Sequence, residues 1–282
     1  MPRFSLIIPT VGRTTELAKL LVSIDQQKRD DVELVVVDQN DDNRISLLIE
    51  ALPFQLNLRH LRVIQKNVSA ARNSGMDAAS GEIFAFPDDD CWYPSGLLDQ
   101  VDAWFRSHAE YAVLATGALD DEGLVSGNRW FQSVCDINTW NALRTTFCSS
   151  LFICAAERSR QVRFDPQVSH GEETDFILRL LATGLRGRFD RALHIHHPRR
   201  DMLSGTVSKE RARKYGAGMG RLARRNSQVV LWAGLLAYDV ARALLVSARG
   251  KFDDAGFCFA HAEGLFRGFL LPKVTYESNV SQ

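Results

Sequence analysis

The sequence predicts an α/β protein with a mixed, mostly parallel sheet and a C-terminal helical extension. Short apolar runs alternate with segments of helical periodicity through the first half, which is typical of βαβ units. Beyond about residue 200 the helical patterns continue without strands. The 282 residues, 45% hydrophobic and 24% charged, are enough to bury a real core. We expect one domain over residues 1–200 and a helical region over 201–282.

The expected strands are short apolar runs, and a continuous run such as Val35–Val37 is typical of a strand buried on both faces. They cover Phe4–Ile8, Glu33–Val37, Leu58–Ile64, Ile83–Phe86 and Ala112–Thr116. A helix is expected after Thr14 or Thr15, because the leucines that follow recur at helical spacing. Another covers Ser69–Ala79 and is ended by Gly81.

Charge and cysteine content exclude several classes of protein. The 34 Lys and Arg are balanced by 34 Asp and Glu, whereas a dedicated nucleic-acid binder carries a strongly basic surface. The five cysteines form no CxxC pair and the N-terminus has no signal-type segment, so we expect a cytoplasmic protein without a disulfide framework. The GxGxxG, P-loop and GxSxG motifs do not occur, which disfavours dinucleotide oxidoreductases, NTPases and serine hydrolases.

Three consecutive aspartates, Asp88, Asp89 and Asp90, follow the expected strand Ile83–Phe86. Their mutual repulsion is costly unless a cation is present. Hard divalent ions such as Mg²⁺ or Mn²⁺ take carboxylate oxygens and share them with substrate phosphates, so the cluster favours a metal-diphosphate site. The alternative is a solvated acidic turn.

Other polar residues lie where ligands bind in such sheets, outside the carboxyl ends of the strands. Asp38 follows Val35–Val37 and could accept hydrogen bonds from a base or ribose, or act as a turn residue. Arg13 follows the first strand, and Arg72 lies on a helix rich in small residues. Each guanidinium could face a phosphate or be an ordinary arginine of the protein surface.

Two later segments carry candidate acid–base or metal groups. Glu172 and Glu173 begin a predicted helix, where acids complement the helix dipole or, near an acceptor, serve as a general base. His194, His196 and His197 precede a proline, and one imidazole could complete a metal site or meet a phosphate, although a structural role is the alternative.

Taken in order, these motifs resemble family 2 glycosyltransferases with the GT-A fold, a Rossmann-like fold of nucleotide-diphospho-sugar transferases. The matching segments are Ser5–Thr10, Val35–Asp38, Ala71–Asn73, Gly81–Ile83, Phe86–Asp90 and Gly171–Glu173. The resemblance covers residues 3–200 and implies an inverting transferase that uses a nucleotide-diphosphate sugar and a divalent metal. The short segment Lys214–Arg221 is similar to one in bacterial members that build surface polysaccharides.

The resemblance also implies a role for each matching residue. Contacts to the nucleotide and its sugar would come from Pro9, Thr10, Arg13, Asp38, Arg72 and Asp88. Asp89 and Asp90 would hold the metal, although three consecutive aspartates leave the frame of the DxD motif open. His196 would be the downstream metal or phosphate histidine, with His197 as the alternative.

Glu173 stands where the family usually has an aspartate base, and this departure leaves Glu172 as a competitor. The base would deprotonate an acceptor hydroxyl, and one displacement at the anomeric carbon would invert its configuration. The metal would neutralise charge on the departing diphosphate. Two rival hypotheses are a sugar-1-phosphate nucleotidyltransferase and a non-catalytic nucleotide-sugar-binding assembly protein.

The helical extension raises the question of membrane contact. Arg199–Arg225 holds nine basic residues against two acidic ones, and Val229–Ala248 is apolar except for Asp239 and Arg242. A charge at the centre of a membrane span costs about 2.5 to 3.5 kcal/mol, so we expect a helix at the interface or packed on the protein rather than a span. Location at the inner face of the cell membrane suits an acceptor linked to a polyprenyl diphosphate.

The segment Gly117–Phe147 has no assigned fold in this reading. Its aromatic residues Trp130, Phe131 and Trp140 could stack on sugar faces or pack in the core.

Overall fold

The computed structural model describes residues 1–53, 56–126, 133–143, 147, 149–168, 170–198 and 205–271, without the side chains of 205–208. It contains two compact units. The sheet unit consists of Met1–Gln167 with Glu172–Arg200, and the helical unit consists of Val168–Gly171 with Asp201–Gln282. Trp130 and Phe131 lie outside the described residues, and Trp140 is half exposed.

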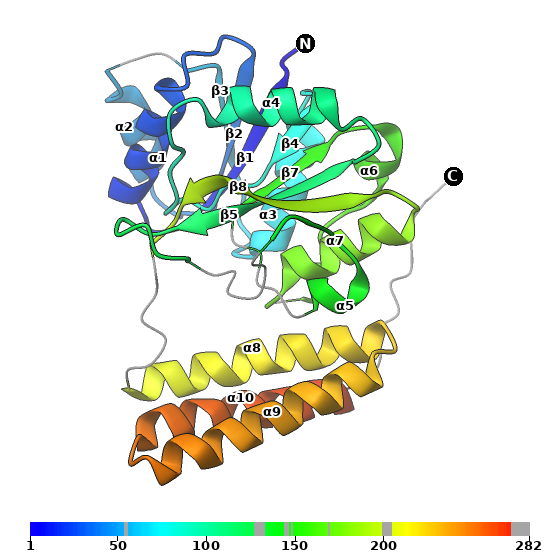
Figure 1. The fold of residues 1–282 in the computed structure, drawn as a ribbon. Coiled ribbons are helices and arrows are strands. Elements are labelled where there is room, and N and C mark those ends of the chain that lie inside the picture. Colours follow the sequence, from blue (N-terminus) through cyan, green and yellow to red (C-terminus); the bar gives the residue numbers. More distant parts are fainter. Residues whose placement is uncertain are drawn as a thin grey trace. The chain divides into compact units, whose positions relative to one another are not determined.

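The described part of the sheet unit holds an eight-stranded sheet in the order β3-β2-β1-β4-β7-β5-β8-β6 (Figure 1). The strands are β1 Phe4–Thr10, β2 Val32–Asp38, β3 Leu58–Arg62, β4 Ile83–Ala85, β5 Val113–Leu119, β6 Cys135–Asp136, β7 Leu151–Cys154 and β8 Gly187–His196. β1 to β4 pair in parallel, and so do β5 and β8. β7 is antiparallel to both β4 and β5, and β6 to β8. The predicted mixed, mostly parallel sheet is confirmed.

Helices cover both faces of this sheet, which explains why the central strands β1, β2 and β4 are buried at every position. They are α1 Thr15–Asp25, α2 Arg44–Glu50, α3 Val68–Ala78, α4 Leu97–Ser107, α5 Thr139–Ala142, α6 Glu157–Gln161 and α7 Glu172–Ala182. α1 and α4 share a buried cluster with Phe4, Leu6 and Ile8 of β1. α3 packs on the opposite face, where a Cβ on Gly75 would lie 2.3 Å from the side chain of Ile7. Only glycine permits that approach.

The order of the strands creates the position of the site. From β1 the chain moves outward to β2 and β3, and then returns through α3 to β4 on the other side of β1. This reversal leaves a crevice outside the carboxyl ends of β1 and β4, which is where ligands bind in open α/β sheets. Pro9–Arg13 spans the end of β1, and Asp88–Asp90 follows the end of β4.

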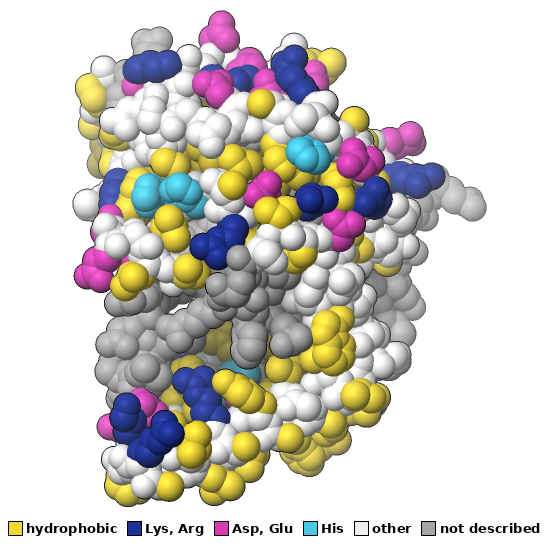
Figure 2. All heavy atoms as spheres, viewed as in Figure 1, with side chains coloured by type: hydrophobic (Ala, Val, Ile, Leu, Met, Phe, Trp, Pro, Cys, Tyr) yellow, Lys and Arg dark blue, Asp and Glu magenta, His cyan; other side chains and the backbone are white. Residues whose placement is uncertain are grey.

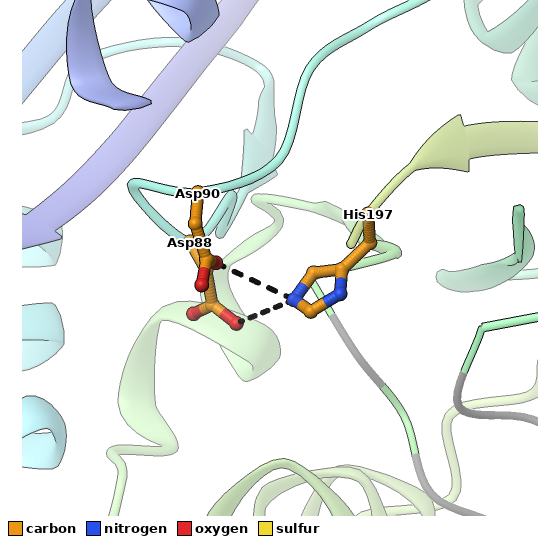
Figure 3. Close-up of side chains that lie close together, drawn as sticks. All are labelled: Asp88, Asp90 and His197. Atoms are coloured by element: carbon orange, nitrogen blue, oxygen red, sulfur yellow. Dashed lines mark ion pairs between the residues drawn. The ribbon is translucent and has the colours of Figure 1, made fainter. Parts of the chain in front are cut away.

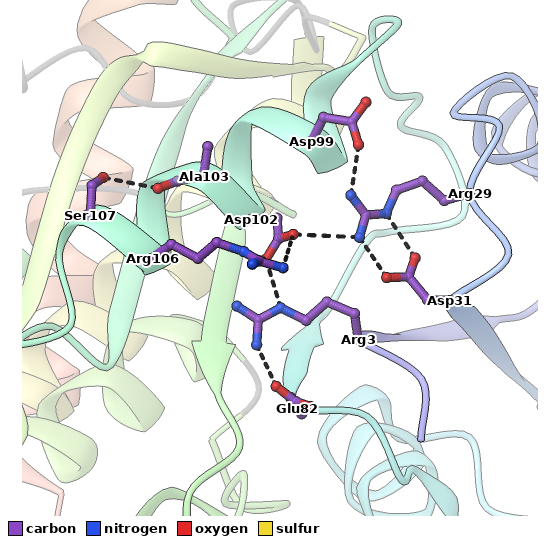
Figure 4. Close-up of polar contacts among 9 residues, drawn as sticks. All are labelled: Arg3, Arg29, Asp31, Glu82, Asp99, Asp102, Ala103, Arg106 and Ser107. Carbon is purple, nitrogen blue, oxygen red and sulfur yellow. Dashed lines mark hydrogen bonds and ion pairs between the residues drawn. The ribbon is translucent and has the colours of Figure 1, made fainter.

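A polar network fastens α4 to the start of the sheet (Figure 4). Asp102 of α4 accepts a hydrogen bond of 2.7 Å from Arg3 and one of 3.1 Å from Arg106, and Arg29 lies 3.6 Å away. Arg3 also pairs with Glu82. Asp102 therefore balances three cations while it is nearly buried.

The helical unit consists of α8 Gly205–Arg225, α9 Val229–Ala248 and α10 Phe252–Leu270. Glycines let the backbones of α8 and α10 touch. A Cβ on Gly216 would lie 2.2 Å from the carbonyl oxygen of His261, and one on Gly264 would lie 2.2 Å from that of Arg213. Gly220 and Gly268 repeat the contact four residues later on each helix. Gly216 and Gly220 of the segment Lys214–Arg221 thus serve helix packing.

Candidate active site

Two aspartates and a histidine form a compact cluster at the end of β4 and β8 (Figure 3). His197 Nε2 lies 3.4 Å from Asp90 Oδ1 and 4.0 Å from Asp88 Oδ2. One ligand atom from each of the three side chains lies within 4.8 Å of the other two. The aspartates that point together are therefore the first and third of the three, which fits a DxD frame of Asp88 and Asp90.

The orientation of His197 suits a metal ligand. Its Nδ1 lies 2.9 Å from the carbonyl oxygen of Pro198, so this nitrogen carries the proton and donates it there. Nε2 then presents its lone pair toward the carboxylates, an arrangement typical of metal-binding histidines. The two carboxylates are donors that Mg²⁺ and Mn²⁺ take, and the imidazole suits Mn²⁺ better than the harder Mg²⁺, so the cluster fits a divalent ion of the kind that the resemblance implies.

The structure places His196 elsewhere. His196 ends β8 and its ring stacks on Trp92, with 5.3 Å between ring centroids and 12° between planes. His194 lies on the same side, 5.6 Å from His196. Because side chains alternate along an extended chain, the next residue, His197, points the other way, toward the aspartates. The histidine beside the two aspartates is therefore His197, which the sequence analysis gave as the alternative to His196.

Asp89 has partners of a different kind from those of its two neighbours. Thr10 donates a hydrogen bond of 2.7 Å to one of its oxygens, and Arg13 binds the other. Arg13 also lies 2.9 Å from Asp90. Burial raises the pKa of Asp89, and the hydrogen bonds from Thr10 and Arg13 oppose that rise. Asp89 thus ties the loop after β1 to the acidic cluster, rather than joining the group of Asp88, Asp90 and His197.

Arg72 of α3 connects the cluster to the acids at the start of α7. Its Nη2 lies 2.9 Å from Asp88 Oδ1 and 2.9 Å from Glu173 Oε1, and its Nη1 lies 3.6 Å from Glu172 Oε1. The side chain is only 1% exposed. Sequence reasoning expected Arg72 to meet the nucleotide or its phosphates, whereas the structure surrounds it with three carboxylates of the protein.

Two stacked phenylalanine rings pack against the guanidinium of Arg72. Arg72 Cζ is 5.1 Å from the ring centroid of Phe164, and Phe164 stacks on Phe176 at 4.0 Å. Asn73 holds Phe164 in place, because its side chain donates to the carbonyl of Phe164 at 2.9 Å and accepts from its N–H at 2.8 Å. Asn73 therefore fixes the position of the phenylalanine ring against which the guanidinium of Arg72 packs.

The low exposure of the two glutamates changes their acidity. Burial raises the pKa of Glu172 to about 8, and the charge of Glu173 adds to the rise while Arg72 opposes it. Burial also raises the pKa of Glu173, again against Arg72. A carboxyl group with a pKa raised toward neutrality is suited to accept a proton during turnover.

A cavity of about 250 Å³ opens beside the cluster. It is lined by Pro9, Val11, Arg13, Gln39, Lys66, Asn67, Val68, Asp88 and Asp89. Pro9, Arg13 and Asp88 were expected there. Gln39 lies in the polar segment that directly follows β2 but had no assigned role. Lys66 was missed, although it follows β3 and the rule for strand ends would have found it.

Asp38 is buried completely and is not among the residues that line this cavity. Its carboxylate accepts hydrogen bonds from the backbone and side chain of Asn40, at 2.9 and 2.7 Å, and pairs with His60 at 3.0 Å. Asn40 in turn accepts a hydrogen bond of 2.7 Å from the N–H of Gly12. Sequence reasoning expected Asp38 to read the base, whereas here it supports the loop that carries Arg13.

Comparisons to known proteins identify the family of this chain. A family model described as glycosyl transferase family 2 matches residues 5–150. The chain belongs to glycosyl transferase family 2. Of the curated relatives, a GalNAc(5)-diNAcBac-PP-undecaprenol beta-1,3-glucosyltransferase of Campylobacter jejuni is 32% identical over 134 residues, which cover 45% of this chain and 41% of that protein. The succinoglycan biosynthesis protein ExoM of Rhizobium meliloti is 26% identical over 66% of this chain and 64% of its own length.

Solved structures share the fold of this chain. S. aureus TarS superimposes with a TM-score of 0.63 and 16% identity, over 92% of this chain and 90% of that chain. A mannosyltransferase of Pyrobaculum calidifontis, in complex with GDP-Man and Mn²⁺, gives a TM-score of 0.66 and 17% identity, over 94% and 87%. The chain thus has the GT-A fold. It spans less than half the length of the first curated relatives that it matches.

Proposed function

We propose that the chain is an inverting, metal-dependent glycosyltransferase that moves a sugar from a nucleotide-diphosphate donor to a saccharide acceptor. One observation carries this proposal. A single nitrogen of Arg72 lies 2.9 Å from both Asp88 and Glu173, so it joins the candidate metal cluster to a candidate base. A transferase needs both functions on either side of one anomeric carbon.

The donor would occupy the cavity beside Asp88, with Arg13 and Lys66 as its cationic lining. The fold neighbours were solved with UDP, UDP-GlcNAc and GDP-Man, which supports a nucleoside diphosphate as the ligand class. Asp88, Asp90 and His197 would hold a divalent ion, Mg²⁺ or Mn²⁺. Such an ion neutralises the charge that develops on a departing diphosphate.

Glu173 is our candidate for the general base. It would take the proton of the acceptor hydroxyl, whose oxygen attacks the anomeric carbon as the bond to the diphosphate breaks. The ion pair with Arg72 fixes its carboxylate, and its raised pKa favours proton uptake. Glu172, with a pKa near 8 and a longer contact to Arg72, is the competitor. One displacement inverts the anomeric centre.

The acceptor is proposed to be lipid-linked, with the enzyme at the cytoplasmic face of the membrane. The support is indirect, from the undecaprenol in the name of the Campylobacter relative and the teichoic acid and succinoglycan pathways in the names of others. A nucleic-acid partner is not part of the proposal, since the chain carries no net charge.

The test compares two isosteric variants in one assay. The full chain is incubated with UDP- and GDP-sugars, Mn²⁺ and a bacterial glycolipid extract, and released nucleoside diphosphate is measured. We expect Glu173→Gln to lower turnover by about 100-fold or more while nucleotide binding is retained. Glu172→Gln should lose less.

Four results would contradict parts of the proposal. A larger loss in Glu172→Gln would transfer the base to Glu172. Full turnover in the presence of EDTA would remove the metal. Nucleotide binding by the wild-type chain without any sugar transfer would favour the non-catalytic assembly protein. Formation of a nucleotide sugar from sugar phosphate and nucleoside triphosphate would favour the nucleotidyltransferase.

A further inference from the structure

Helix α9 of the helical unit has its apolar residues on the outside. Among the described residues it is the one helix long and apolar enough to cross a membrane, yet only 11% of its most apolar window is buried in the protein. Val230 is 81% exposed, Leu244 60% and Leu245 53%. A soluble helix normally turns such side chains inward.

The charged group in the middle of α9 points inward instead. Asp239 is 14% exposed and pairs with His261 of α10 at 2.6 Å. This pair fastens α9 along α10, which itself carries acids at Asp253, Asp254 and Glu263. A helix held in this way lies alongside its neighbour. Its polar contact faces the protein, and its apolar side is left exposed to the surroundings.

α10 exposes apolar side chains as well. Phe252, Phe259 and Phe266, spaced seven residues apart, are 73%, 45% and 47% exposed. Figure 2 shows hydrophobic side chains along the outer edge of this unit, with Lys and Arg side chains gathered at one end. Contiguous apolar surface of this kind on a protein marks an interaction site.

Cations border the apolar side chains at the end of α9. A groove of about 520 Å³ is lined by Tyr238, Leu245, Arg242, Arg249 and Lys251, with Asp254 as its acidic member. By contrast, basic residues of α8 are engaged within the unit, such as Lys209 with Asp253 and Arg213 with Glu263. The cations that border the groove, rather than the basic stretch of α8, thus lie beside the apolar face.

We propose that α9 and the exposed phenylalanines of α10 form a membrane-contact face that lies on an anionic phospholipid bilayer. The apolar side chains enter the boundary of headgroups and acyl chains, and Arg242, Arg249 and Lys251 meet lipid phosphates. The combination of apolar side chains with a cationic border matches an anionic lipid surface. This inference deepens the proposed function, because it names the surface through which an enzyme with a lipid-linked acceptor would reach its substrate.

The test is flotation of the full chain with phosphatidylcholine vesicles, with and without phosphatidylglycerol. We expect binding that requires phosphatidylglycerol and weakens with salt. Leu244→Asp combined with Leu245→Asp should weaken binding by about tenfold or more, from the lost apolar transfer. Arg249→Glu and Lys251→Glu should each weaken it by about fivefold.

Matched controls carry the same changes on the sheet unit. Leu47→Asp changes a leucine that is 55% exposed on α2, and Arg158→Glu reverses an exposed charge on α6. Both should float like the wild type. The α9 variants should bind nucleoside diphosphate normally, so a failure of membrane binding is separable from a failure of the donor site.

Two outcomes would overturn the inference. One is wild-type chain that stays unbound at low salt with phosphatidylglycerol present. The other is a concentration-dependent dimer in analytical ultracentrifugation that Leu245→Asp dissolves, combined with no flotation, which would make a second copy the occupant of this face.

Discussion

Arg72 and Glu173 form an ion pair of 2.9 Å in which the arginine is 1% and the glutamate 13% exposed. The same nitrogen of Arg72 reaches Asp88, so the guanidinium sets the position of a candidate base relative to a candidate metal ligand. Its fork offers several donors in a fixed plane, which a lysine cannot reproduce.

Arg72→Lys is therefore expected to lower kcat by about 100-fold, since small errors of position at a reacting centre cost that much. Initial rates measure the loss of kcat, and thermal unfolding followed by circular dichroism measures any loss of stability. Arg29→Lys is the matched control: Arg29 is 14% exposed and pairs with Asp31, Asp99 and Asp102, away from the site. It should lose stability and keep kcat. An Arg72→Lys enzyme with wild-type kcat would contradict the positioning role.

Asp102 should contribute stability that depends on pH. Burial opposes its ionisation, but hydrogen bonds from Arg106 and Arg3 hold its pKa below the usual range. A group with a lowered pKa stabilises the fold above its unfolded pKa, about 4, and this contribution is lost as pH falls further. Asp102→Asn should cost about 2 kcal/mol near pH 7, with a smaller cost in acid.

Urea unfolding at several pH values measures this difference. Asp77→Asn is the control, because Asp77 is 65% exposed and pairs with Arg163 at 3.0 Å. An exposed pair contributes only about 0 to 1 kcal/mol. A cost of Asp102→Asn that stayed constant down to strongly acidic pH would show that its charge is not the cause.

Replacing two glycines of the helical unit by alanine should change stability in opposite directions. A Cβ on Gly264 would lie 2.2 Å from the carbonyl oxygen of Arg213, whereas nothing lies within 4 Å of a Cβ on Gly234. Gly264→Ala should destabilise the packing of α8 on α10 by about 1 to 3 kcal/mol. Gly234→Ala should stabilise α9 by about 0.5 to 1 kcal/mol. Hydrogen exchange of the amides in each helix is the measurement. We expect faster exchange in α8 and α10 of Gly264→Ala, and an unchanged exchange rate in that variant would refute the close contact.

Much of the sheet could be predicted because its apolar runs are continuous and its turns polar. The expected strands Phe4–Ile8 and Glu33–Val37 lie within β1 and β2, and the expected helix Val229–Ala248 has the bounds of α9. The antiparallel insertion of β7 between β4 and β5 was not foreseen, since strand order depends on long-range pairing that no local pattern encodes.

The acidic residues of the site could be named from the sequence, but which of them lie together could not be predicted. Alternation along β8 decides between His196 and His197, and it depends on where the strand ends. The partners of Asp89 and Asp38 come from loops far away in the chain. Lys66 and Gln39 belong to no recognised motif, so only their position after a strand end points to the cavity that they line.

The most direct test of the account is calorimetric titration of UDP and GDP, with and without Mn²⁺, into wild-type, His197→Asn and His196→Asn chains. The two histidines are neighbours, and only His197 lies beside Asp88 and Asp90. We predict Mn²⁺-dependent binding of a nucleotide to the wild type and to His196→Asn, weakened by about 10- to 100-fold or lost in His197→Asn. Equal binding by His197→Asn, or binding lost only in His196→Asn, would contradict it.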